Sequence, residues 1–127
     1  MSEKSLTRKI AVYGSLRKGE YNYDRFGGDK TFKHLGTHSI TGYELFSLGP
    51  YPGVRPASKD KSIVVDVLEC ENGVAAMIDR METGAGYVAK EITVGEHTAT
   101  IYEYNYSITG NSIVESGDWI KFNESRR

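Results

Sequence analysis

Short β-type runs separated by glycine-containing turns constrain the fold of this 127-residue chain more than any other feature. Alternating or β-branched apolar residues predict strands at 9–13, 35–40, 43–48, 62–70, 87–94 and 98–106. The segment 49–53, Gly-Pro-Tyr-Pro-Gly, is the strongest turn signal and cannot lie in the middle of a sheet, because proline lacks an N–H donor. Residues 95–97 join the last two strands as a hairpin. This pattern predicts an α+β fold with a mixed sheet curled around a core.

One amphipathic run interrupts the strands, and a shorter helix is expected at 23–26. The larger apolar side chains of the amphipathic run recur at the i, i+3, i+4, i+7 spacing of one helical stripe and are Val74, Met77, Ile78 and Met81. Glu82 follows Ile78 by four residues and so continues that inward row, just before residues 83–86 end the helix.

Glu82 is therefore a candidate general acid or base. Burial and the negative end of the helix dipole both disfavour the charged carboxylate, and both raise its pKa. A carboxyl group with a raised pKa suits proton transfer near neutral pH. The alternative is a side chain that reaches solvent at the frayed last turn.

Composition excludes several classes of protein. The length predicts one domain over residues 1–127, with a core at about 9–122. A net charge of −1 gives no electrostatic footprint for nucleic acid, and no apolar run is long enough for a membrane span. Neither a signal peptide nor a disulfide is expected, and the single cysteine, Cys70, fits a reducing, cytoplasmic location as a buried structural thiol rather than a nucleophile.

Two further patterns carry weaker predictions. His34 and His38 have the spacing of metal ligands on a helix, but their surroundings predict strand and loop, so no metal site is expected there. Tyr102, Tyr104 and Tyr106 alternate along one strand and share a face. They could wall a pocket or pack the rim of the core, and core packing is expected for at least two of the three.

A glycine loop follows the first strand, where the sequence reads Tyr13-Gly14-Ser15-Leu16-Arg17-Lys18-Gly19. A strand that ends in Gly-Ser exposes successive backbone N–H groups, which can bind a carboxylate or an oxyanion. Glycine also lets a ligand approach the backbone closely. An ordinary turn is the alternative interpretation.

Five short motifs occur in a fixed order over about residues 10–120: Tyr13 to Arg17 with Gly19 and Asn22, Gly42-Tyr43, Tyr51-Pro52-Gly53, Ile78 to Glu82 with Gly86-Tyr87, and Ser116-Gly117-Asp118-Trp119. In this order they resemble the γ-glutamylcyclotransferase-like, or AIG2-like, family. The resemblance implies a small mixed, largely antiparallel β-barrel with one or two flanking helices. It also implies that Glu82 is the catalytic acid/base.

The resemblance further implies which residues bind substrate. Tyr13, Gly14, Ser15 and Leu16 match the loop that holds the α-carboxylate and γ-carbonyl of the substrate through backbone amides. Tyr87 could place its hydroxyl by the substrate or serve in packing. The implied partner is a small γ-glutamyl-containing substrate, with no nucleic acid and no membrane, for a monomer or homodimer that requires no metal or cofactor.

The expected reaction cyclises a γ-glutamyl amide to 5-oxoproline and releases an amine. The sequence departs from the family pattern at Thr83, Tyr23 and Val65-Asp66, where Gly, His and Gly-Glu are usual. These departures suggest altered pocket walls and an unusual substrate. The alternative function is a non-catalytic module that binds or sequesters a small molecule in the same pocket.

Overall fold

The computed structural model describes residues 6–106 and 112–126. The elements run in the order β1 Thr7–Val12, α1 Tyr21–Arg25, the 3-10 helix η1 Gly28–Lys30, β2 Lys33–Thr41, β3 Tyr43–Ser47, β4 Pro52–Pro56, β5 Ser62–Glu71, α2 Asn72–Gly84, β6 Tyr87–Val94, β7 His97–Tyr104, β8 Ser112–Ile113 and α3 Trp119–Ser125. The predicted α+β class is confirmed.

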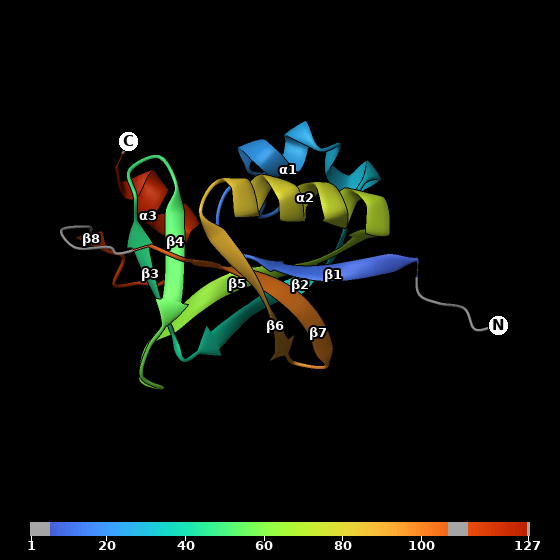
Figure 1. Ribbon diagram of the computed structural model, residues 1–127. Helices are drawn as coiled ribbons and strands as arrows, with labels where there is room; N and C mark the ends of the chain where they lie inside the picture. The colour runs from blue at the N-terminus through green and yellow to red at the C-terminus, as the bar shows by residue number, and fades with distance from the viewer. Residues whose placement is uncertain (1–5, 107–111, 127) are drawn as a thin grey trace.

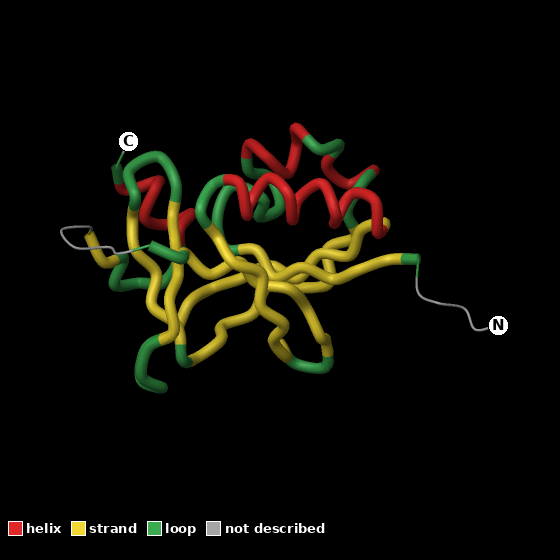
Figure 2. The backbone as a smooth tube through the Cα atoms, in the orientation of Figure 1, coloured by secondary structure: helices red, strands yellow, loops and turns green. Residues whose placement is uncertain are grey.

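The strands form two sheets. A five-stranded sheet has the order β2-β5-β1-β7-β6, and a three-stranded sheet has the order β4-β3-β8. All pairs are antiparallel except β1 with β7, so the sheet is mixed and largely antiparallel, as expected. Helices α1 and α2 lie together over one face of the larger sheet, and α3 lies beside the smaller one (Figure 1). Figure 2 shows α1 and α2 close together above the strands, with α3 apart from them beside the smaller sheet.

The expected barrel is not closed by backbone hydrogen bonds, because β2 and β6 remain the outer strands of the larger sheet. A register shift in β2 between His34 and Gly36 marks a bulge, which increases the bend of a strand. The rings of His38 on β2 and His97 on β7 have centroids 6.2 Å apart, beside the β6–β7 turn. Side chains rather than a hydrogen-bonded ladder therefore bring the two sheet edges together.

The larger sheet is buried on both faces. Ile10 and Leu68 belong to the cluster that contains Ile78 of α2, whereas Val65 and Val67 belong to the cluster that contains Trp119 of α3. A strand covered on both faces favours a continuous apolar run over alternation, which explains the composition of β5.

The inward stripe of α2 differs from the prediction at one residue. Ala75 and Ile78 are fully buried, but Met77 is 50% exposed. Each residue advances a helix by about 100°, so Met77 lies about 100° from Ile78, while Glu82 lies about 40° from it. The prediction favoured the larger side chain, and the small Ala75 takes the inward position.

Three elements were not predicted: the 3-10 helix η1, strand β4 and helix α3. The sequence from Ile113 to Trp119 predicts a short edge element, and β8 is indeed an outer strand that pairs with β3. Trp119, however, begins α3, and Asp118 caps this helix by accepting hydrogen bonds from the N–H groups of Ile120 and Lys121. Strand β4 begins inside the predicted turn, at Pro52. Proline is tolerated there because β4 is an outer strand of its sheet.

Candidate functional site

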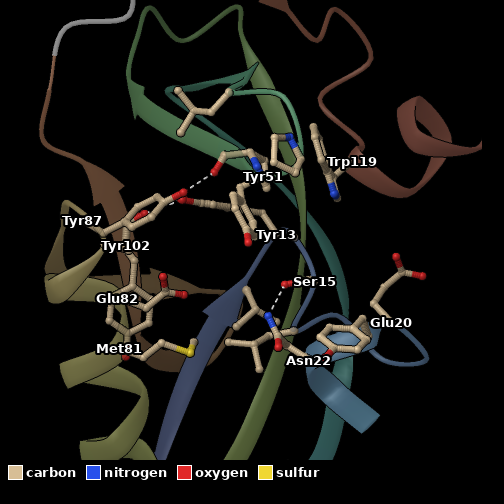
Figure 3. Close-up of a pocket in the computed structure, with 18 of the residues that line it drawn as sticks. Tyr13, Ser15, Glu20, Asn22, Tyr51, Met81, Glu82, Tyr87, Tyr102 and Trp119 are labelled. Carbon is tan, nitrogen blue, oxygen red and sulfur yellow. Dashed lines mark hydrogen bonds between the residues drawn. The ribbon is translucent and has the colours of Figure 1, made fainter. Parts of the chain in front are cut away.

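A cleft of about 950 Å³ lies where the glycine loop, α2 and the turn before β4 meet. The six predicted site residues all line it, and they are Tyr13, Gly14, Ser15, Leu16, Glu82 and Tyr87. Figure 3 shows Glu82, Tyr87 and Tyr102 on one side of this cleft and Glu20 and Trp119 on the other. The structure therefore brings together the residues that the sequence singled out.

The glycine loop is folded back on itself. The carbonyl oxygen of Ser15 accepts hydrogen bonds from the N–H groups of Asn22 and Tyr23, and its hydroxyl accepts one of 2.7 Å from the Asn22 amide. The N–H groups of Ser15 and Leu16 donate to no acceptor in the part of the chain that the structure describes. Such amides are available to an anionic ligand. The Leu16 side chain is buried in the core, so only its backbone can serve a ligand.

The loop begins at Gly14, where a close contact with Pro52 leaves no room for a side chain. A Cβ atom at this position would lie 2.7 Å from Cγ of Pro52, closer than real Cβ atoms approach. The loop and the Tyr-Pro-Gly turn, far apart in the sequence, therefore pack directly against each other.

A buried ion-pair network holds the loop from behind. The Arg17 guanidinium lies 3.4 Å from Oδ2 of Asp66 on β5 and 3.0 Å from Oδ1 of Asp118 before α3. Asp66 also accepts hydrogen bonds from the Lys18 N–H and the Thr37 hydroxyl. Burial alone would raise the pKa of Asp66, but these donors and Arg17 hold it below its usual value. Sequence reasoning missed this role of Asp66 and Asp118.

Glu82 lies in the last turn of α2, as predicted, with its carboxylate partly buried in the cleft. Burial raises its pKa to about 7, and no side chain of the described residues forms an ion pair or hydrogen bond that would lower it. A carboxyl group with such a pKa is populated in both protonation states at neutral pH, which suits a proton shuttle.

The tyrosines around Glu82 direct their hydroxyl protons elsewhere. Tyr13 donates to the carbonyl oxygen of Tyr102, Tyr87 to that of Pro52, and Tyr102 to the carboxylate of Asp79, each at 2.6 Å. Tyr87 thus ties the start of β6 to the start of β4 as well as lining the cleft.

Of the three alternating tyrosines, Tyr102 and Tyr104 pack at the rim of the core, as expected, and Tyr106 does not; the Tyr104 ring contacts the buried Phe46 edge-on, at 5.8 Å between ring centroids. Only Tyr102 is buried; Tyr104 is partly exposed and lines the cleft, and Tyr106 is 63% exposed. The reason is that β7 ends at Tyr104, so the alternation does not continue to Tyr106.

The departures from the family pattern lie outside the lining of the cleft. The residues that line the cleft do not include Thr83, Tyr23 or Val65-Asp66. Tyr23 is buried against Phe32, and Thr83 is exposed and donates to the carbonyl oxygen of Asp79. These substitutions affect packing around the site rather than its surface.

Other candidate chemistry lies outside the cleft. Cys70 is buried, and burial raises the pKa of its thiol to about 11, as expected of a structural cysteine. Within residues 6–106 and 112–126, no cluster of three or more His, Cys, Asp and Glu side chains is placed to hold a metal ion. None of the helices in these segments has the length and apolarity needed to cross a bilayer.

Comparison with known proteins shows which family model and which relatives the chain matches. Residues 10–121 match the family model described as gamma-glutamyl cyclotransferase, AIG2-like. The chain is 33% identical over 113 residues to the gamma-glutamylcyclotransferase family protein YtfP of Escherichia coli K12, an alignment that covers 88% of this chain and 96% of that protein. It is also 35% identical over 120 residues to PH0828 of Pyrococcus horikoshii, with 94% and 97% covered.

Solved structures agree with these matches. The crystal structure of PH0828 superposes with a TM-score of 0.79 over 94% of this chain and 95% of that one, at 28% identity in the structural alignment. The solution structure of YtfP from Escherichia coli superposes with a TM-score of 0.71 over 91% and 98%.

Proposed function

The chain belongs to the gamma-glutamyl cyclotransferase, AIG2-like family, and from this membership we propose that it releases 5-oxoproline and a free amine from a small γ-glutamyl amide or peptide. The observation that carries the proposal is Glu82, an unpaired carboxylate with a pKa raised to about 7 in a cleft of about 950 Å³. A group of this kind is suited to proton transfer at neutral pH.

The proposed step is an intramolecular displacement. The α-nitrogen of the substrate attacks the γ-carbonyl carbon, a C–N bond closes the five-membered lactam, and the bond to the leaving nitrogen breaks. Two protons leave the α-ammonium group and two reach the leaving amine, so none is consumed. Because the nucleophile is already tethered, the enzyme mainly folds the substrate and moves protons. Glu82 is the group we assign to that transfer.

The glycine loop is assigned to substrate binding. The N–H groups of Ser15 and Leu16, which have no backbone acceptor in the described residues and belong to the lining of the cleft, are the donors that we assign to the α-carboxylate or the developing oxyanion. One such donor contributes about 3 kcal/mol of transition-state stabilisation in other enzymes. Tyr13, Gly14 and Tyr87 shape the wall around it. The Arg17 network behind the loop supports the rigidity that this role demands.

The test is turnover of a panel of γ-glutamyl amides, with 5-oxoproline measured by mass spectrometry. Wild type is expected to form product and Glu82→Gln is expected to form none, while both retain the fold by circular dichroism. Glu20→Gln is the matched control, because Glu20 is a second carboxylate that lines the same cleft. Full activity in Glu82→Gln would reject the assigned role, and a ligand that binds but is recovered unchanged from wild type would identify a binding module.

A further inference from the structure

Three tyrosines share the cleft with Glu82. Tyr13, Tyr87 and Tyr102 line the cleft together with Glu82, and Figure 3 shows Tyr87 and Tyr102 on the same side of it as Glu82. Each of the three also interacts electrostatically with Glu82. Each of them donates its hydroxyl proton to another acceptor. A phenol that donated to the carboxylate would stabilise its charged form, lower its pKa and make it a weaker base.

Two of the competing acceptors are backbone carbonyls, and the third is the side chain of Asp79. Asp79 Oδ1 accepts the Tyr102 hydroxyl at 2.6 Å, and both carboxylate oxygens receive hydrogen bonds from Arg8, at 2.6 and 3.2 Å. Asp79 lies on α2 three residues before Glu82, so the two side chains lie on neighbouring sides of consecutive turns. Arg8 belongs to β1 and Tyr102 to β7.

Asp79 can therefore influence the surroundings of Glu82 through Tyr102 and through α2, without contacting a substrate. It is the only one of the three acceptors that a side-chain substitution can remove. It also ties α2 to two strands, which fixes the turn that carries Glu82. Asp79 does not line the cleft.

We propose that Asp79 is a positioning residue: it sequesters the hydroxyl proton of Tyr102, and so keeps Glu82 free of a hydrogen-bond donor while anchoring the end of α2. The catalytic consequence rests on the proposed function, but the hydrogen-bond arrangement itself does not. Tyr13 after β1, Tyr87 of β6 and Tyr102 of β7 are titratable groups that interact electrostatically with Glu82, and the Arg8–Asp79 pair lies one turn earlier on α2.

The experiment titrates Glu82 directly, in protein labelled with ¹³C at the glutamate side-chain carboxyl. The Glu82 resonance is assigned by its absence from Glu82→Gln. Asp79→Ala removes the acceptor, so the freed Tyr102 hydroxyl is expected to donate to Glu82 and to lower its pKa by about 1 unit, the scale of one hydrogen bond to a carboxylate. Asp79→Asn is the matched control, because it removes the charge but keeps an oxygen for Tyr102.

Two further variants separate the hydroxyl from charge and from folding. Asp79→Ala combined with Tyr102→Phe has the same charges as Asp79→Ala but no hydroxyl, so the Glu82 titration is expected to return towards that of wild type. Tyr102→Phe alone is expected to leave the titration unchanged, and it keeps the test decisive if Asp79→Ala does not fold. A raised Glu82 pKa in Tyr102→Phe, or equal titrations in Asp79→Ala and the double variant, would overturn the proposal.

The readout needs no substrate. If wild type forms no 5-oxoproline while the titrations follow the expected pattern, the proposed function fails and the positioning role stands. If product forms but Glu82 titrates alike in all variants, the positioning role fails alone.

Discussion

Glu82→Gln should stabilise the protein at alkaline pH and leave its stability almost unchanged in acid. Burial raises the pKa of Glu82 from its ordinary value of 4.5 to about 7 in the folded state. The folded state therefore binds more protons than the unfolded state between these two values. The contribution of Glu82 to the free energy of unfolding accordingly falls as pH rises from 4.5 to 7, and the loss is complete above pH 7.

The size of the effect follows from the same interval. About 2.5 pH units between 4.5 and 7 correspond to about 3 kcal/mol at 1.36 kcal/mol per unit, an upper bound since Glu82 is only partly buried. Glutamine has nearly the same shape and cannot ionise, so it escapes this cost. Glu82→Gln should therefore be more stable than wild type by up to about 3 kcal/mol at pH 8 and by almost nothing at pH 4.

Urea unfolding of both proteins at the two pH values measures the difference. Comparing the variant with wild type cancels the titration of all other groups. A difference between Glu82→Gln and wild type that is the same at pH 4 and pH 8 would refute the reasoning, because it would mean that folding does not shift the titration of Glu82.

Three further predictions concern the scaffold. Asp66→Asn should lower the free energy of unfolding by about 3–5 kcal/mol at pH 7, because it breaks a buried ion pair, and by less at pH 3; urea denaturation at both values checks it. The pH dependence has this direction because the Asp66 pKa is lower in the folded state than in the unfolded state. Such a group stabilises the fold at pH values above its unfolded-state pKa, and this stabilisation is lost in acid. Asp118→Ala should cost about 1 kcal/mol as a lost helix cap, with a further loss from its pair with the Arg17 guanidinium, seen as a lower Tm. Ile78→Ala should lower the free energy of unfolding by about 2–5 kcal/mol, and Met77→Ala should lower it by less than about 1 kcal/mol, because Ile78 is buried and Met77 is half exposed. Equal losses for the two variants in urea denaturation would contradict the assigned orientation of α2.

Local periodicity predicted the parts of the site that depend on one segment. The apolar spacing before Glu82 located α2 and placed the carboxylate on its inward side. The error at Met77 arose because residue size was weighed above angular position. Helix α3 was missed because seven residues carry little periodic signal, although Asp118 before Trp119 is the kind of residue that caps a helix.

Contacts between distant segments could not be predicted in the same way. Arg17 meets Asp66 and Asp118, and Asp79 meets Arg8, only because the chain folds back over many residues. The motifs drew attention to Arg17, Asp79 and Asp118, but no spacing rule says which charged side chains pair. The same limit applies to the sheet, whose pairing order and open edges depend on tertiary packing.

The walls of the cleft have different tolerances for change. The chemical wall around Glu82 belongs to α2 and is tied to two strands through Asp79. The opposite rim includes Pro50 and the 59% exposed Tyr51, which belong to a turn outside the core clusters. Substitutions in that turn are expected to leave the surroundings of Glu82 unchanged. Under the proposed function, a lineage with this architecture can therefore diverge in the compounds it accepts while its reaction chemistry stays constant, and directed evolution of new preferences should begin at residues 48–51.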